Sequence, residues 1–132
     1  MNIAIFTETY TPQINGVVVS IETFRKELER MGHTVFILAP GFNKRTLADS
    51  KEQTVPSMAA SNPIAPERLH RVFSVRYPFK YMKEQRFCVP FPWDLAGFGK
   101  RKIDIIHAQV TSSNTGNFAI LVGRLFGIPV VH

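Results

Sequence analysis

A polar loop between a short apolar segment and an amphipathic helix opens this chain, and this order constrains its fold most. Residues 2–6 are apolar, residues 7–16 are polar, and a second apolar run covers residues 33–39. Between them, apolar side chains recur at steps of three and four residues: Val17, Ile21, Phe24, Leu28 and Met31. Gly32 follows this helical stripe, where a helix end favours a left-handed glycine. The sequence therefore predicts a βαβ unit with parallel strands, the start of an α/β fold.

Gly16 stands at the start of the predicted helix, a place that favours anions. The first N–H groups of a helix are unpaired and carry a partial positive charge, and a glycine lets a ligand approach the backbone. We therefore expect a phosphate-bearing ligand here, the alternative being a tight turn without a ligand. The loop holds one glycine and lacks both the G-x-G-x-x-G and the P-loop patterns, which disfavours nicotinamide, flavin and P-loop enzymes.

The last third of the chain repeats the strand and helix pattern. Residues 103–107 predict a buried strand, and the polar pair His107 and Gln109 stands where it ends. Ligands of open parallel sheets sit at the carboxyl ends of strands, so this pair is expected at the same edge as Gly16. The alternative for His107 is a structural hydrogen bond that ties the strand end to a loop. A helix up to Gly127 and a strand at 128–132 are expected to follow.

Composition predicts one globular domain, and neither a metal site nor a cofactor is expected. The 132 residues are 45% hydrophobic, enough for one core, and no apolar run approaches the roughly 20 residues of a membrane span. Cys88 is the single cysteine, so neither an internal disulfide nor a metal-ligand pattern is expected. The N-terminus lacks a basic signal-peptide start, which favours a cytoplasmic setting.

The middle of the chain is basic and rich in proline. Between Lys44 and Lys102, twelve Lys or Arg face five Asp or Glu, and seven of the nine prolines lie between Pro40 and Pro92. We expect loops at about 41–70 and 76–102, with a short strand at 71–75 between them. Three interpretations stay open: a surface for single-stranded nucleic acid, a surface for an anionic membrane, or a solvated basic loop. The absence of an RNP-type signature disfavours nucleic acid.

Several segments, in order along nearly the whole chain, resemble the N-terminal domain of group 1 glycosyltransferases, the retaining family 4. They are IFTETYTPQINGVV at 5–18, GHTV at 32–35, DIIHAQ at 104–109 and GIPVVH at 127–132. Glu84, Arg86 and Pro90 resemble an element of the bacterial branch that glucosylates diacylglycerol and related lipids.

The resemblance implies a GT-B enzyme with two Rossmann-like domains that face each other across a cleft. Residues 1–132 would be an incomplete, acceptor-side N-terminal domain with helices on both faces of its parallel sheet, and a C-terminal domain beyond the chain would hold the nucleotide. The resemblance implies these roles: donor diphosphate at Asn15, Gly16 and Val17; orientation of donor sugar or acceptor at His107 and Gln109; acceptor contacts at Glu8, Tyr10 and Arg86. Many relatives have histidine at position 109, and glutamine cannot shuttle a proton at neutral pH.

The expected function is transfer of a sugar, with retention, from a UDP- or GDP-sugar to a lipid or glycan acceptor. The enzyme is expected in the cytoplasm, with the inner membrane face as a second location, and the isolated 132 residues are expected to be inactive. The competing hypothesis is a non-catalytic α/β module that binds anionic lipid or another polyanion through its basic middle.

Overall fold

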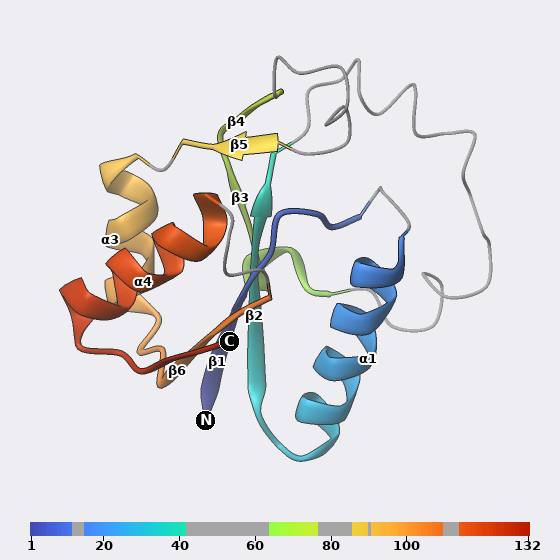
Figure 1. Ribbon diagram of the computed structural model, residues 1–132. Coiled ribbons are helices and arrows are strands. Elements are labelled where there is room, and N and C mark those ends of the chain that lie inside the picture. Colours follow the sequence, from blue (N-terminus) through green and yellow to red (C-terminus); the bar gives the residue numbers. More distant parts are fainter. Residues whose placement is uncertain (12–14, 42–63, 77–85, 90, 110–113) are drawn as a thin grey trace.

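A five-stranded parallel sheet with the order β3-β2-β1-β6-β7 forms the centre of the molecule (Figure 1). The computed structural model describes residues 1–11, 15–41, 64–76, 86–89, 91–109 and 114–132. The strands of this sheet are β1 (Asn2–Phe6), β2 (Thr34–Pro40), β3 (Leu69–Val72), β6 (Ile105–Ala108) and β7 (Val130–Val131). Every pairing in this sheet is parallel, which confirms the predicted Rossmann-like α/β fold.

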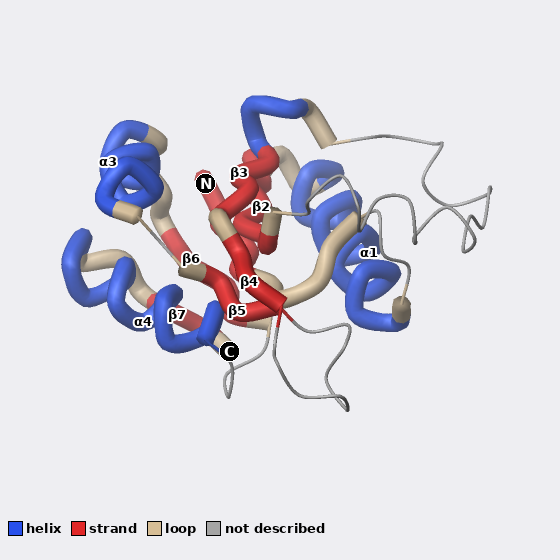
Figure 2. Tube along the Cα trace, turned by 90° about the horizontal axis from the view of Figure 1, so that it is seen from above, coloured by secondary structure: helices blue, strands red, loops and turns tan. Residues whose placement is uncertain are grey.

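Helices cover both faces of the sheet, as predicted (Figure 2). Helix α1 (Gly16–Arg30) lies on one face, and α3 (Pro92–Lys100) and α4 (Asn114–Phe126) lie on the other. Each face has its own apolar core. Ile5, Val18, Ile21 and Ile37 belong to the core under α1, and Phe6, Phe98, Phe118 and Val122 belong to the core under α3 and α4.

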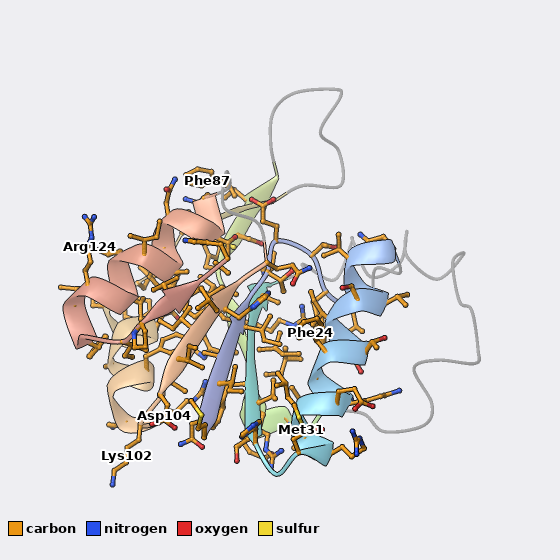
Figure 3. All side chains as sticks on the ribbon, turned by 60° about the horizontal axis from the view of Figure 1, so that its bottom comes forward. Phe24, Met31, Phe87, Lys102, Asp104 and Arg124 are labelled. Atoms are coloured by element: carbon orange, nitrogen blue, oxygen red, sulfur yellow. The ribbon has the colours of Figure 1, made fainter. Side chains whose placement is uncertain are left out.

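The core-facing side of α1 differs from the predicted apolar stripe. Its buried side chains are Val18, Ile21 and Arg25, whereas Phe24 and Met31 are 54% and 57% exposed (Figure 3). The guanidinium of Arg25 is buried because carboxylates on the same helix pair with it, which removes the penalty of an unpaired buried charge. The predicted stripe is therefore confirmed at Ile21, with Val17 and Leu28 packed against the same core, and is wrong at Phe24 and Met31.

The loop prediction for 76–102 is wrong where α3 forms, and the prediction for 41–70 is wrong at its end. Pro92 occupies the first turn of α3, and Pro66 begins a short 3-10 helix, η2 (Pro66–Arg68). Proline is favoured at the first helical position because its missing N–H would be unpaired there anyway. The prolines of this region therefore begin helical turns as well as interrupting regular structure. Residues 42–63 and 77–85 lie outside the described part.

The strand predicted at 71–75 is divided into two strands at Phe73. Strand β3 ends at Val72, and β4 (Ser74–Arg76) pairs antiparallel with β5 (Arg86–Cys88) in a separate sheet. The chain changes sheets just after the end of β2. The carbonyl oxygen of Val72 still accepts the N–H of Gly41, which directly follows β2, whereas the carbonyl oxygen of Phe73 accepts the N–H of Val89, which directly follows β5. This two-stranded sheet lies beyond the carboxyl ends of β2 and β3 (Figure 1).

Candidate functional site

The carboxyl edge of the sheet brings the β1–α1 loop next to the end of β6. Strand pairing sets Phe6 opposite Ala108, and the N–H of Gln109 donates to the carbonyl oxygen of Phe6 at 3.0 Å. One residue earlier in each strand, His107 lies opposite Ile5. Two polar segments that are far apart in the sequence therefore leave the sheet from neighbouring strand ends, where ligands of open α/β sheets bind.

Unpaired N–H groups mark the first turn of α1. Asn15 is the N-cap: its Oδ1 accepts the N–H of Val18 at 3.0 Å, and its Nδ2 donates to Oγ1 of Thr9 at 3.1 Å. Within the described ranges, no acceptor contacts the N–H of Gly16 or Val17. A Cβ at Gly16 would meet no atom of the described residues within 4 Å, so these residues leave space around this backbone. The helix end therefore offers two donors and its positive dipole end to an anion.

His107 and Gln109 form a side-chain pair at the end of β6. The Nε2 atom of His107 lies 3.1 Å from Oε1 of Gln109. An amide oxygen accepts, so the imidazole donates through Nε2 in this contact. The ring of Phe24 on α1 lies 5.7 Å from the imidazole, centroid to centroid. The hydrogen bond predicted for His107 is present, and its half-buried side chain lies at the carboxyl edge of the sheet, where contact with a ligand stays a prediction.

The three residues expected on the acceptor side have different surroundings. Glu8 is half-buried in the β1–α1 loop, and Arg86 belongs to β5, with its side chain outside the described part. Tyr10 is 1% exposed, and its hydroxyl donates to Oε1 of Glu22. Burial, followed by this contact with Glu22, raises the pKa of the Tyr10 phenol. The ring of Tyr10 therefore has almost no exposed surface in this structure, and its contact with an acceptor stays a prediction.

Arg71 also belongs to this edge, and sequence analysis did not identify it as a site residue. Its guanidinium donates to the carbonyl oxygen of Pro40 at 3.1 Å, to the carbonyl oxygen of Thr11, and lies 5.7 Å from the ring centroid of Tyr10. Burial lowers the pKa of Arg71. The only signal was its place at the start of the strand predicted at 71–75, and the basic residues around it made that signal hard to recognise.

Two further features of the described residues bear on function. No three His, Cys, Asp or Glu side chains among them come together as a metal-binding group. No helix in the same ranges has the length and apolar character needed to cross a bilayer.

Comparison with known proteins connects the chain to a family. The sequence model of Glycosyltransferase Family 4 matches residues 14–132. The chain is 34% identical over 139 aligned residues to an alpha-monoglucosyldiacylglycerol synthase of Streptococcus pneumoniae, covering 100% of the chain and 26% of that protein. It is 27% identical over 133 residues to the protein of the same name in Acholeplasma laidlawii, covering 100% of the chain and 29% of that protein. The chain therefore spans between a quarter and a third of the length of these relatives.

Proposed function

Because the chain belongs to glycosyltransferase family 4, we propose that it forms the acceptor-side domain of an enzyme that transfers a sugar from a nucleotide donor to a diacylglycerol-type lipid. The observation that carries this proposal is the 34% identity, over the whole chain, to a protein named alpha-monoglucosyldiacylglycerol synthase. Under this proposal the donor is a UDP- or GDP-sugar, and the transfer retains the anomeric configuration. The second half of the site belongs to a C-terminal domain that binds the nucleotide.

The proposed role of the α1 N-terminus is to stabilise charge on the leaving diphosphate. The bond from the anomeric carbon to the diphosphate breaks, and the acceptor oxygen bonds to that carbon from the same face. The acceptor proton passes to the departing diphosphate. The N–H groups of Gly16 and Val17 are the donors for the growing negative charge, since preorganised donors need no rearrangement as the bond breaks.

His107 and Gln109 are proposed to orient the sugar and the acceptor hydroxyl. The amide of Gln109 does not titrate near neutral pH, so it cannot remove the acceptor proton. The geometry also keeps the Nε2 hydrogen of His107 in the bond to Gln109, at 3.1 Å. This contact supports orientation as the task of the pair, and the departing diphosphate is the proposed acceptor of the proton.

A lipid acceptor requires access to a membrane surface, and we propose an aromatic and basic region of this domain as that surface. Phe73, Phe87 and Trp93 are 54%, 39% and 66% exposed, and the ring of Phe91 stacks on Trp93 with 4.5 Å between centroids. Aromatic rings prefer the interface of a bilayer, and the basic excess of the chain favours anionic lipids at the cytoplasmic face. The alternative, a non-catalytic module on anionic lipid, would use the same surface without turnover.

The test is an assay of the complete gene product with UDP- and GDP-sugars and with diacylglycerol vesicles or soluble glycans as acceptors. We expect release of nucleoside diphosphate that depends on the lipid, and a glycolipid whose anomeric configuration matches the donor by NMR. Residues 1–132 alone are expected to show no transfer. Vesicle binding by the complete protein without any turnover would favour the non-catalytic module.

Vesicle co-sedimentation tests the membrane surface separately. We expect binding to anionic vesicles that weakens when the salt concentration rises, because salt screens the attraction between basic side chains and lipid head groups. Trp93→Ala is expected to weaken it further, whereas Leu121→Ala, which removes an exposed apolar side chain from the outer side of α4, serves as the control. Equal loss in the two variants would remove this surface from the proposal.

A further inference from the structure

We propose that Arg71 is a positioning residue, which holds the β1–α1 loop so that Gly16 and Val17 can meet the donor diphosphate. This inference rests on the proposed function. Arg71 lies in β3, yet its guanidinium donates to carbonyl oxygens of two other segments: Pro40 at the end of β2, at 3.1 Å, and Thr11 in the loop. One side chain therefore joins three segments at the carboxyl edge of the sheet.

Tyr10 gives this contact a second point of attachment. The Arg71 guanidinium lies 5.7 Å from the ring centroid of Tyr10, and the Tyr10 hydroxyl donates to Glu22 on α1. Arg25, which is 1% exposed, donates to the same carboxylate through Nη2 at 2.8 Å and to Glu29 through Nη1 at 2.7 Å. The loop is thus held between β3 on one side and the first two turns of α1 on the other.

Thr9 connects the held part of the loop to the helix N-terminus. The side chain of Asn15 donates to Oγ1 of Thr9 at 3.1 Å, while the Oγ1 of Thr7 donates to the carbonyl oxygen of Thr9 at 2.8 Å. A displacement of Tyr10 and Thr11 would therefore reach the N-cap through one residue and one hydrogen bond. The two free N–H groups directly follow this cap.

The chemistry of the position favours arginine over lysine. A planar guanidinium donates in several fixed directions at once and packs over an aromatic ring, whereas an ammonium group is a compact point charge on a flexible stem. Lysine at position 71 would keep the charge but would not hold both carbonyl oxygens and the ring together. The conservative substitution therefore tests geometry separately from charge.

The experiment compares Arg71→Lys, Arg71→Met and Tyr10→Phe with the wild type in the complete gene product. The matched control is Arg30→Met, which changes an exposed pair on α1 in which Arg30 and Glu27 are 72% and 57% exposed. Steady-state release of nucleoside diphosphate gives KM for donor and acceptor separately. Hydrogen exchange of the peptide amides of residues 7–18 reports the loop without any need for turnover.

We expect Arg71→Met to raise the donor KM about tenfold, within the losses that a displaced positioning group causes, and to leave the acceptor KM within about twofold. Arg71→Lys and Tyr10→Phe are expected to raise the donor KM by a smaller factor. All three variants are expected to have faster amide hydrogen exchange in residues 7–18 than the wild type. Arg30→Met should change neither quantity.

Two results would overturn the inference. An unchanged donor KM in Arg71→Met, with a lower kcat or a lower melting temperature alone, would reduce Arg71 to a structural residue. Unchanged exchange in residues 7–18 would remove the positioning role even if the wild type turned over no nucleotide sugar. Absence of turnover in the wild type, with faster exchange in the variants, would instead contradict the proposed function and the donor role of the loop while leaving the contact itself in place.

Discussion

The Nε2 atom of His107 lies 3.1 Å from Oε1 of Gln109, across the end of the strand that pairs with β1. The pair is local in sequence, since its members are two residues apart and point to the same face of the strand. The amide oxygen of Gln109 accepts, so the imidazole donates through Nε2 in this contact. The structure thereby gives Gln109 a task that does not require it to carry a proton.

Removal of this pair is predicted to lower turnover without loss of the fold. We expect His107→Ala to reduce kcat of the complete enzyme by about 10²-fold and Gln109→Ala by about tenfold, in the range seen for loss of one preorganised polar group. His33→Ala is the matched control, because His33 lies at the amino edge of the sheet, 3.4 Å from the N-terminal nitrogen. A rate for His107→Ala equal to that of His33→Ala would exclude His107 from the site.

Acid sensitivity is predicted to depend on Glu22. Burial acts to raise the pKa of this carboxyl, but the hydrogen bonds from Arg25 and Tyr10 outweigh burial and hold the pKa below its usual range. The stabilisation is therefore complete above the unfolded-state pKa of about 4.3 and is lost as the pH falls through the lower folded-state value. We expect Glu22→Gln to have a lower melting temperature than the wild type at neutral pH and a smaller further decrease on acidification.

Thermal melts at about pH 7 and about pH 3 measure this difference directly. Glu27→Gln is the control, since Glu27 belongs to an exposed pair and exposed pairs contribute little to stability. A parallel acid-induced decrease in Glu22→Gln and the wild type would contradict the assignment.

Two glycines are predicted to respond in opposite directions to alanine. A Cβ at Gly123 would lie 2.3 Å from Cγ2 of Val130 and 2.8 Å from the carbonyl oxygen of Ile128, so α4 approaches the chain before β7 too closely for a side chain. We expect Gly123→Ala to cost about 1–3 kcal/mol of unfolding free energy, as overpacking does. Gly97 in α3 has open space, so Gly97→Ala should stabilise by about 0.4–1 kcal/mol. Urea unfolding of both variants measures these changes.

The pair His70 and Asp94 is predicted to hold α3 against the sheet. Nε2 of His70 lies 2.7 Å from Oδ1 of Asp94, and Oδ2 of Asp94 accepts the N–H of Phe91 at 2.8 Å. Asp94 is 4% exposed, and its loss leaves the half-buried donors of His70 and Phe91 without this acceptor. Asp94→Ala is expected to cost about 2–3 kcal/mol in urea unfolding, and Asp104→Ala, at an exposed residue on the amino edge of the sheet, is the comparison. Equal losses of unfolding free energy in Asp94→Ala and Asp104→Ala would contradict the proposed role of the His70 and Asp94 pair.

The regular parts of the fold could be predicted because their signals are local. The helical stripe and the glycines that end two helices, Gly32 with φ 88° and Gly127 with φ 65°, can be identified without knowledge of the tertiary structure. The position of His107 and Gln109 also followed from sequence, because a parallel sheet gathers the carboxyl ends of its strands at one edge.

The features that sequence analysis missed depend on contact partners. Some partners are distant in the sequence, and others allow a residue type that is usually exposed to be buried. Arg25 looked like a solvent-facing residue, but Glu22 and Glu29 allow its guanidinium to be buried. Tyr10 looked like a loop residue that is open to a ligand. It belongs to the core, however, because it contacts α1 and also Arg71 of β3, which lies 61 residues later in the sequence. Helix α3 was missed because proline counts against a helix except at its first turn.

The most direct test of the account is the effect of Gly16→Asp on donor binding by the complete enzyme. A Cβ at this position meets no atom within 4 Å, and an acidic residue in the first turn of a helix is favourable, so the fold should keep or gain stability. The new carboxylate would occupy the anion site and repel the diphosphate. We predict a donor KM raised at least about tenfold at an unchanged or higher melting temperature, whereas Gly16→Ser stays near the wild type. A stable Gly16→Asp enzyme with the wild-type donor KM would contradict the claim that this helix end binds the donor diphosphate.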